Sequence, residues 1–207
     1  MIKENIVKLE LRPGSPISEN ELSQTLGLSR TPVREALMEL SRVKIVEVIP
    51  QKTSIVAPID FDTVGEFIFM RSILECAVVR ECCRLSSPED VEKLRESLRL
   101  QNFYLEKYYT DSLVELDNEF HRLLFSIAGK PQVYGLMQEL AVHFDRVRNM
   151  ALGNVKNTSI VRDHEAIVEA VSQRDEDAAA RLMEMHLGRY GLDRETVAAK
   201  YPDIVTK

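Results

Sequence analysis

The sequence predicts a mainly α-helical protein, with an N-terminal winged helix-turn-helix head and a C-terminal antiparallel bundle of six or seven helices. Three observations support this fold class. Residues 18–40 contain two short helical patterns separated by a glycine, residues 44–56 are rich in β-forming residues, and only helical periodicity follows residue 61. We therefore expect two domains, one over residues 1–58 and the other over residues 59–207.

The first helices of the head are predicted to be short. Apolar residues at positions 2, 6 and 9 indicate a helix over residues 2–9. Ser18 and Glu21 have the spacing of a capping box and predict the start of a second helix. Gly27 is expected to end that helix, because glycine adopts the left-handed backbone of a helix C-terminus without steric cost.

A third helix is predicted to begin at Thr31 and Pro32. A threonine hydroxyl caps a first turn well, and proline is favourable at the first helical position, where its missing N–H costs nothing. Arg30, Thr31 and Arg34 then occupy the polar side of the first turns. This part of a recognition helix presents side chains to base edges. The alternative is an ordinary helical hairpin with a solvated charged face.

The segment after these helices predicts a β-hairpin. Its β-branched residues are interrupted by Pro50 and by three polar residues, Gln51, Lys52 and Thr53, which would form a cationic tip. Helix, turn, helix and hairpin make a winged helix. In such a head, Gln51, Lys52 and Thr53 are expected to contact the DNA backbone or minor groove.

These motifs resemble the DNA-binding head of the GntR family of bacterial transcription regulators. The resemblance rests on PG at 13–14, the SE-x-EL run at 18–22 and LSRTPVREAL at 28–37. Family members usually have glycine at the positions of Lys44 and Thr53, and often a phosphate-contacting arginine at that of Asn20, so the wing is expected to differ. Their first helix is also longer, so either this head is abbreviated or native residues precede the first methionine.

Charge is distributed unevenly along the chain. Residues 1–58 hold eight Lys/Arg and seven Asp/Glu, a net of +1, whereas residues 59–207 hold 19 and 26, a net of −7. An acidic body repels DNA, so the head must concentrate its cations at the recognition helix and wing tip. One short recognition helix contacts too few base pairs for specificity. We therefore expect a homodimer that binds an inverted repeat in double-stranded operator DNA.

Composition also indicates where the protein acts. The sequence has no apolar run near 18 residues and no signal peptide, so we expect a soluble, cytoplasmic protein with no membrane partner. Its three cysteines, Cys76, Cys82 and Cys83, fall in one helical stretch. Buried free thiols are therefore expected in preference to a disulfide or a metal cluster.

The second domain shows only helical patterns. Helices are predicted over residues 62–85, 88–108, 112–129, 131–151, 158–173 and 175–190, with a weak tail helix near 193–200. The breaks between them contain the usual helix-ending residues, such as Ser86-Ser87-Pro88, Gly129-Lys130-Pro131 and Gly153-Asn154. Short loops between successive helices predict an antiparallel all-α bundle.

This bundle resembles the ligand-sensing domain of the FadR subfamily within the GntR family. The resemblance rests on Arg71-x-x-Leu74-Glu75, on Asp117-x-x-Phe120-His121 and on two later helix-borne histidines. It implies a domain that couples a small acidic metabolite to release of DNA. It also implies that the bundle holds a metal ion, as many members do.

Four residues are candidate ligands for that metal ion. Asp117 and His121 are four residues apart and share one helix face, while His164 and His186 flank the apolar faces of later helices. One carboxylate and three imidazoles suit a borderline divalent ion, with Zn²⁺ favoured and Ni²⁺, Co²⁺, Mn²⁺ or Fe²⁺ as alternatives. Spacing alone leaves open that these are hydrogen-bonded core residues; the resemblance implies the metal. His143, the fourth histidine, matches no ligand position.

A carboxylate effector requires a cation in the bundle. Arg71 matches the family pattern and is the candidate effector-binding residue, while Arg146 and Arg148 are weaker candidates. Two other functions remain open. The metal could serve a hydrolase by activating water, although no second catalytic group stands at a motif spacing and the head disfavours an enzyme. Alternatively, the metal could be purely structural in a constitutive regulator.

Overall fold

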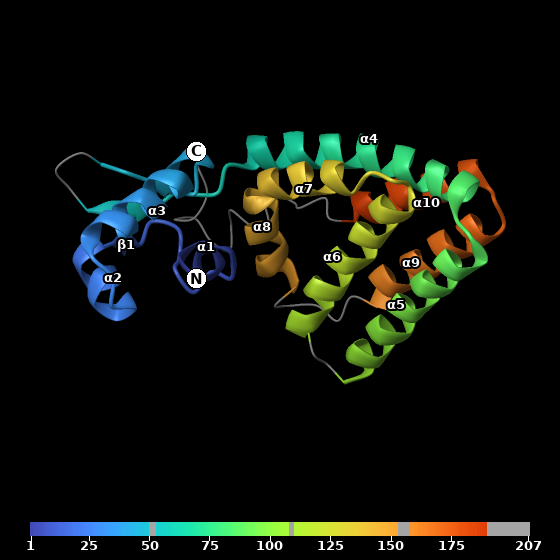
Figure 1. The fold of residues 1–207 in the computed structure, drawn as a ribbon, viewed down its shortest axis with the longest axis horizontal. Coiled ribbons are helices and arrows are strands. Elements are labelled where there is room, and N and C mark those ends of the chain that lie inside the picture. Colours follow the sequence, from blue (N-terminus) through green and yellow to red (C-terminus); the bar gives the residue numbers. More distant parts are fainter. Residues whose placement is uncertain (50–52, 108–109, 153–157, 190–207) are drawn as a thin grey trace. The chain divides into compact units, whose positions relative to one another are not determined.

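The computed structural model confirms the mainly α-helical fold class, with a short three-stranded sheet near the N-terminus (Figure 1). It describes residues 1–49, 53–107, 110–152 and 158–189. The predicted tail helix near 193–200 lies outside these residues, as do Gln51 and Lys52 of the wing tip. Residues 1–65 together with 140–150 form one compact unit. Residues 66–139 form the other, together with the described residues from 151 onward.

The first unit contains the predicted helix-turn-helix. Its helices are α1 (Ile2–Val7), α2 (Glu19–Leu26) and α3 (Arg30–Arg42). The hydroxyl of Ser18 accepts a hydrogen bond from the backbone N–H of Glu21, and Gly27 ends α2 with a φ of 64°, as predicted. The start of α3 corrects the prediction: its N-cap is Ser29 and not Thr31. Pro32 therefore occupies the third helical position, where an N–H still needs no partner within the helix.

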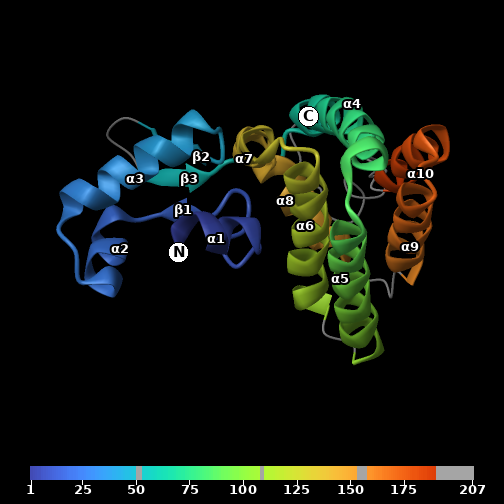
Figure 2. The same ribbon diagram turned by 45° about the vertical axis from the view of Figure 1, so that its right-hand side comes forward.

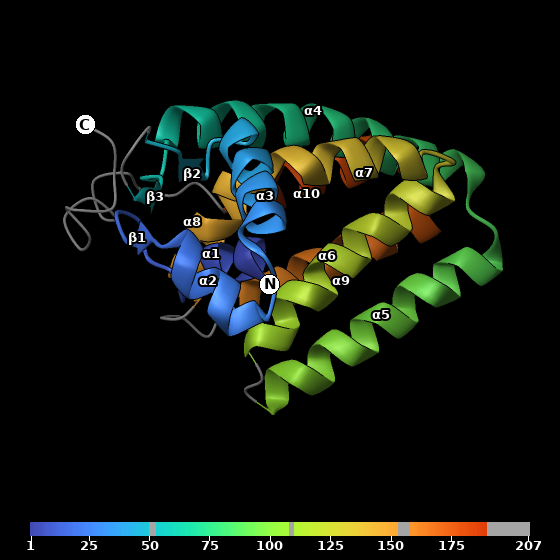
Figure 3. The same ribbon diagram turned by 60° about the vertical axis from the view of Figure 1, so that its left-hand side comes forward.

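The wing is present as a hairpin of two antiparallel strands, and a third short strand joins it in one sheet. The strands are β1 (Pro16–Ile17), β2 (Val46–Glu47) and β3 (Ser54–Val56), in the order β1-β3-β2 (Figure 3). Val46 lies opposite Val56, which confirms the hairpin, whereas the two-residue strand β1 was not predicted. Lys44 has a φ of 59°, a left-handed backbone that glycine adopts more easily. This conformation gives a physical reason for the family's glycine at this position.

The core of the first unit includes a residue from far along the chain. Its buried apolar residues are Ile6, Ile17, Val33, Leu37, Leu40, Ile45, Val46, Val56 and Val142. Val142 opens α8 (Val142–Leu152), which follows α7 (Pro131–Leu140) after a break at Ala141. The prediction of one helix over 131–151 was therefore wrong. No glycine or proline marks this break, and burial of Val142 in the core accounts for it better than local sequence does.

The second unit is a helical bundle. Besides α7 it comprises α4 (Phe61–Leu85) from residue 66, α5 (Pro88–Glu106), α6 (Thr110–Ile127), α9 (Thr158–Ser172) and α10 (Glu176–Gly188). Helix α9 packs against α5 and α10, and α5 packs against α6 (Figure 2). All five of these helices end within three residues of their predicted bounds. The bundle therefore brings residues from α4, α5, α6, α9 and α10 to a common interior.

Capping contacts start two helices of the bundle, and the cysteines are free thiols as predicted, with Cys82 and Cys83 buried and Cys76 half-buried. Ser87 and Asp90 form a reciprocal capping box at the start of α5, and Asp175 caps α10. The three cysteines are free, and burial raises the pKa of Cys82 to about 12 and that of Cys83 to about 11. Among the described residues, no helix is both long enough and apolar enough to cross a membrane.

Candidate metal centre

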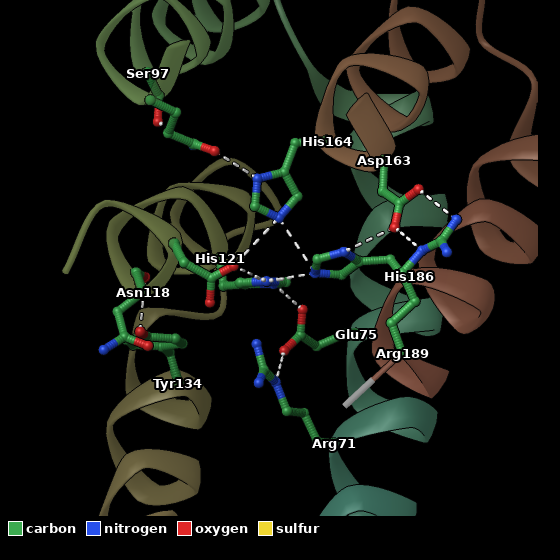
Figure 4. Close-up of polar contacts among 12 residues, drawn as sticks. Arg71, Glu75, Ser97, Asn118, His121, Tyr134, Asp163, His164, His186 and Arg189 are labelled. Carbon is green, nitrogen blue, oxygen red and sulfur yellow. Dashed lines mark hydrogen bonds and ion pairs between the residues drawn. The ribbon is translucent and has the colours of Figure 1, made fainter. Parts of the chain in front are cut away.

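The structure brings the four candidate ligands together inside the bundle. Among the described residues, Asp117, His121, His164 and His186 each offer one ligand atom, and these atoms all lie within 4.8 Å of one another. Helix α6 supplies Asp117 and His121 from one face. Helix α9 supplies His164 and α10 supplies His186, and the three histidine rings point toward one another (Figure 4). All four side chains are buried. Three helices thus converge on one polar cluster in the interior of the bundle.

The Nε2 atoms of the three histidines face one another. Nε2 of His186 lies 3.2 Å from Nε2 of His121 and 3.2 Å from Nε2 of His164. The carboxylate of Asp117 completes the cluster, with Oδ1 3.8 Å from Nε2 of His121 and 3.5 Å from Nε2 of His164. A tetrahedral ion with bonds of about 2.0–2.1 Å separates its ligands by about 3.3 Å. The spacing of these atoms fits such an ion.

The ring of His121 is fixed from its other side by α4. Its Nδ1 donates a hydrogen bond to Oε2 of Glu75, whose other oxygen accepts from Nε of Arg71 at 2.5 Å. Burial alone would raise the pKa of Glu75, but the charge of Arg71 and the hydrogen bonds from Arg71 and His121 outweigh burial and hold it at about 2. Glu75 is therefore a carboxylate, and the proton of a neutral His121 sits on Nδ1. The lone pair of Nε2 then points into the cluster.

The ring of His164 is held in the same orientation by α5. Its Nδ1 lies 2.7 Å from Oε1 of Gln101, while Nε2 of that amide donates to Oγ of Ser97 at 3.2 Å. With the amide oriented by Ser97, its oxygen accepts from Nδ1 of His164 and leaves Nε2 as the lone-pair nitrogen. Phe120 stacks on the His164 ring, with centroids 4.0 Å apart. The ring is therefore fixed by packing as well as by hydrogen bonding.

His186 has an acidic partner on α9. Its Nδ1 lies 3.6 Å from Oδ2 of Asp163, longer than an ordinary hydrogen bond. Asp163 in turn pairs with Arg189, whose Nη2 lies 3.0 Å from Oδ1. The proximity of His186 and the hydrogen bonds and charge of Arg189 outweigh the effect of burial and lower the pKa of Asp163. A carboxylate behind a ligating imidazole is the usual outer partner of a metal-bound histidine.

Burial keeps two of the rings neutral. It lowers the pKa of His121, and this effect, with the charge of Arg71, outweighs the charges of Glu75 and Asp117, which act in the opposite direction. The pKa of His164 is lowered further, first by burial and then by the charge of His186. A neutral imidazole is the form that binds metal. The cluster therefore offers nitrogen lone pairs near neutral pH and needs no deprotonation of these two rings.

Of the three arginines considered as effector ligands, Arg71 lies beside the cluster and is buried against Glu75. Arg146 and Arg148 lie on α8, in the first unit. Arg146 donates from Nη2 to the carbonyl of Ala57 at 2.6 Å and from Nη1 to that of Pro58 at 3.4 Å. Arg148 pairs with Asp145 of its own helix at 3.2 Å.

Three of the predicted DNA-contacting residues, two from α3 and one from the wing, line a groove of about 550 Å³. Arg30, Arg34, Thr53, Glu19 and Asn20 are among its lining residues. Thr31 is exposed at the start of α3. Both arginines contact one acid: Nε and Nη2 of Arg34 donate to the carboxylate of Glu19, and Nη2 of Arg30 lies 3.6 Å from it.

Several residues of these two sites were missed in the sequence. Glu75 falls in the Arg71 motif, four residues after the arginine, and that spacing was a signal for their ion pair. Gln101 and Asp163 carry no motif, and they become visible only when α5, α9 and α10 pack together. Glu19 carries none either, because its partner is 15 residues away on the next helix.

Comparison with known proteins gives consistent matches along the chain. Residues 66–189 match the family described as FCD domain, and residues 1–56 match the one described as bacterial regulatory proteins, gntR family. The HTH-type transcriptional repressor RspR of Escherichia coli (strain K12) is 34% identical over 188 residues, covering 90% of this chain and 82% of the relative. An uncharacterized HTH-type transcriptional regulator in an unstable DNA locus of Streptomyces ambofaciens is 32% identical, covering 98% and 86%.

Solved structures show the same fold. The E. coli protein McbR/YncC superposes with a TM-score of 0.75 at 20% identity, over 97% of this chain and 93% of that one. A putative GntR transcriptional regulator from Rhodococcus sp. RHA1 superposes with a TM-score of 0.70 at 21% identity, over 99% and 95%. These proteins share the arrangement of a helix-turn-helix head and a helical C-terminal domain.

Proposed function

The chain belongs to the GntR family of bacterial transcriptional regulators and carries an FCD domain, and from this premise we propose that it senses a small organic acid through a bound divalent metal ion. In this proposal residues 1–58 bind the operator, and residues 59–207 sense the effector and form the dimer. The matched proteins are transcriptional regulators and not enzymes, so the hydrolase alternative has no support. A regulator of bacterial genes acts in the cytoplasm, which is the proposed location.

The convergence of Asp117, His121, His164 and His186 is the observation that carries this proposal. If His121 and His164 carry their protons on Nδ1, His186 can donate from Nε2 to only one of them. At least one of these two rings then keeps an Nε2 lone pair beside the negatively charged carboxylate of Asp117, whose Oδ1 lies 3.8 Å from Nε2 of His121 and 3.5 Å from Nε2 of His164. A divalent cation, with Zn²⁺ favoured, resolves this clash by accepting all four donors. When bound, the ion supplies an electrophilic centre for a further oxygen ligand.

The proposed effector is a small carboxylate. Zinc sites can expand from four to five ligands, so an acid oxygen can join the four protein donors. Arg71 is the proposed partner of the acid, because it is buried and its charge acts on both His121 and His164. The nearby carboxylate of Glu75 keeps Arg71 in place through a bond of 2.5 Å.

Operator binding is proposed to use a two-fold dimer. Arg30, Thr31 and Arg34 would contact bases or phosphates, and Gln51, Lys52 and Thr53 would contact the backbone or minor groove.

Support for a dimer comes from exposed apolar side chains of the bundle. Phe69 and Ile73 lie one turn apart on α4 and are 69% and 55% exposed, and Leu136 on α7 is 64% exposed. Such residues favour association with a second copy.

The effector is proposed to act on DNA through the linker at residues 57–60. A ligand held by residues of α6, α9 and α10 changes the balance between arrangements of these helices. Arg146 of α8 donates hydrogen bonds to the carbonyls of Ala57 and Pro58 in this linker. A change in the bundle that moves α8 would therefore also move the linker and, through it, the head. Both half-sites must be engaged together, and a change in the spacing of the two recognition helices alters affinity. Couplings of this kind are typically about 1–3 kcal/mol.

The test begins with protein stripped of metal by a chelator. Zn²⁺ should raise the melting temperature, and one of a set of small organic acids should raise it further only when Zn²⁺ is present. His164→Ala should abolish both shifts. His143→Ala is the matched control, since His143 is also buried but lies in the other unit, and it should retain both. An acid that stabilises metal-free protein equally well would favour a structural ion instead.

A further inference from the structure

We propose that Glu19 sets the base preference of the head by holding Arg34 in the orientation that reads guanine. This inference rests on the proposed role of Arg34 in DNA binding. The proposal means that an acidic residue favours DNA recognition, although it lies on the surface proposed to face the negatively charged DNA. In it Glu19 is a positioning residue that acts through Arg34.

The contact between the two side chains is a two-point clamp. Nε of Arg34 donates to Oε1 of Glu19 at 3.1 Å, and Nη2 donates to Oε2 at 2.9 Å. Glu19 is the first residue of α2, whereas Arg34 lies in the second turn of α3, so the clamp joins the two helices of the motif. Hydrogen bonding to Arg34 lowers the pKa of Glu19, which therefore remains ionised at neutral pH.

The clamp leaves one edge of the guanidinium open for recognition. A guanidinium carries five N–H groups, and Glu19 takes the one on Nε and one of the two on Nη2. One N–H of Nη1 and the second N–H of Nη2 lie side by side along the far edge. A bidentate contact from arginine to O6 and N7 of guanine uses such a pair of N–H groups. Arg34 and Glu19 both line the groove between α2, α3 and the wing, so the clamped pair belongs to the surface proposed to face DNA.

The clamp also explains how an acid can be useful on this surface. Arg34 is 62% exposed, and an unrestrained arginine there would bind any nearby phosphate. Glu19 restricts the side chain to one orientation and adds a negative charge that repels the backbone of non-cognate DNA. Specificity rises when such a repulsive element weakens the wrong complexes more than the right one. Arg30, 3.6 Å from the same carboxylate, is held less tightly and remains suited to a phosphate contact.

The experiment compares full-length variants on duplexes that the wild-type protein enriches from a random-sequence pool. Dissociation constants for the enriched duplex and for a scrambled duplex are measured at one salt concentration. The specificity ratio is the dissociation constant for the scrambled duplex divided by that for the enriched duplex. In Glu19→Gln this ratio should fall by about fivefold or more, the lower range for losing one bidentate base contact. Binding to the scrambled duplex should be unchanged or tighter. A second selection with this variant should lose the preference for one guanine in each half-site and keep the rest.

Glu21→Gln is the matched control. Glu21 is also a glutamate in the first turn of α2, and both changes remove an acid from the helix N-terminus. Its ratio should stay within about twofold of wild type. An equal fall in both variants would assign the effect to the helix and overturn the proposal. So would a Glu19→Gln variant that tightens both duplexes by the same factor.

Two further variants separate this inference from the proposed function. If Arg34→Ala binds the enriched duplex as tightly as wild type, the role of Arg34 in DNA binding is itself wrong. If Arg34→Ala weakens binding but Glu19→Gln keeps the ratio, only the role of Glu19 fails. In the double variant, Glu19→Gln should not lower the ratio further than Arg34→Ala does, since the acid acts through that arginine.

Discussion

The carboxylate of Glu75 accepts a hydrogen bond from Nδ1 of His121, and this contact joins α4 to α6 directly behind the histidine cluster. The same carboxylate holds Arg71. Glu75 therefore fixes both the ring of His121, which faces the cluster, and the guanidinium of Arg71, which is proposed to bind the effector. The first prediction concerns its removal.

Glu75→Gln is expected to lower Zn²⁺ affinity about 10- to 100-fold, the usual loss when an outer partner of a ligating histidine is changed. The melting temperature should fall as well, because Arg71 then loses the acid that neutralises it in a buried position. Competition with a coloured chelator measures the affinity. Glu66→Gln, an exposed change on the same helix, is the control. Unchanged Zn²⁺ affinity in Glu75→Gln would argue that the ion is bound elsewhere.

Replacement of both Arg30 and Arg34 by alanine is expected to abolish specific DNA binding. Arg34→Ala alone should cost about 1–3 kcal/mol if that arginine reads a base. Gel shifts with DNA from the protein's own promoter region measure the effect. Arg42→Ala provides the control, since Arg42 is exposed at the far end of the same helix and pairs with Glu39. If the double variant binds this DNA with wild-type affinity, α3 is not the recognition helix.

Protonation of His143 is expected to destabilise the first unit in mild acid. Burial lowers the pKa of His143 below 6.5, Arg146 lowers it further, and Asp60 opposes both. Below about pH 6.5 the unfolded chain binds a proton that the folded chain does not, so the free energy of unfolding falls as pH falls. His143→Phe should reduce this slope between about pH 6.5 and 5. Denaturant unfolding at several pH values checks it, and an unaltered slope would contradict the assignment.

Loss of Arg146 is expected to uncouple the effector from DNA. Arg146→Met removes the bonds to the carbonyls of Ala57 and Pro58. Thermal stabilisation by Zn²⁺ and by the acid found in the screen should persist. In the wild-type protein, operator affinity with and without that acid should differ by about 5- to 150-fold, the range of a typical coupling. In Arg146→Met this ratio should move towards one. Arg148→Met, at another buried arginine of α8, should keep the wild-type ratio.

Much of the fold could be predicted because its signals are local. Ser18 and Gly27 bound α2 through contacts within a few residues, and Asp117 and His121 share a face because they are four residues apart. The features that escaped prediction depend on distant partners. The break at Ala141 has no local signal and follows from packing of Val142, 86 residues after Val56 in the same core. Gln101 meets His164 only through the packing of α5 on α9.

The start of α3 was misplaced for a different reason. Thr31 and Pro32 make a sound cap signal, but Ser29 makes an equivalent one two residues earlier. Local sequence alone does not choose between them, because proline is acceptable throughout a first turn. The family resemblance indicated the candidate metal ligands, and only the packing of the helices revealed the partners behind them.

Val142 also bears on how such regulators evolve and how they can be dissected. It is 3% exposed in the core of the first unit, and Asn149 of the same helix donates to the carbonyl of Val7 at 2.9 Å. A DNA-binding module cut from the chain at residue 58 would leave both contacts behind and expose an apolar hole. Residues 1–58 are therefore not an independent folding unit. A recombination event that moves this head to another protein must also move α8, or must replace the apolar contacts that α8 makes. Chimaeras joined at residue 58 are expected to be less stable than those that keep α8 with its own head.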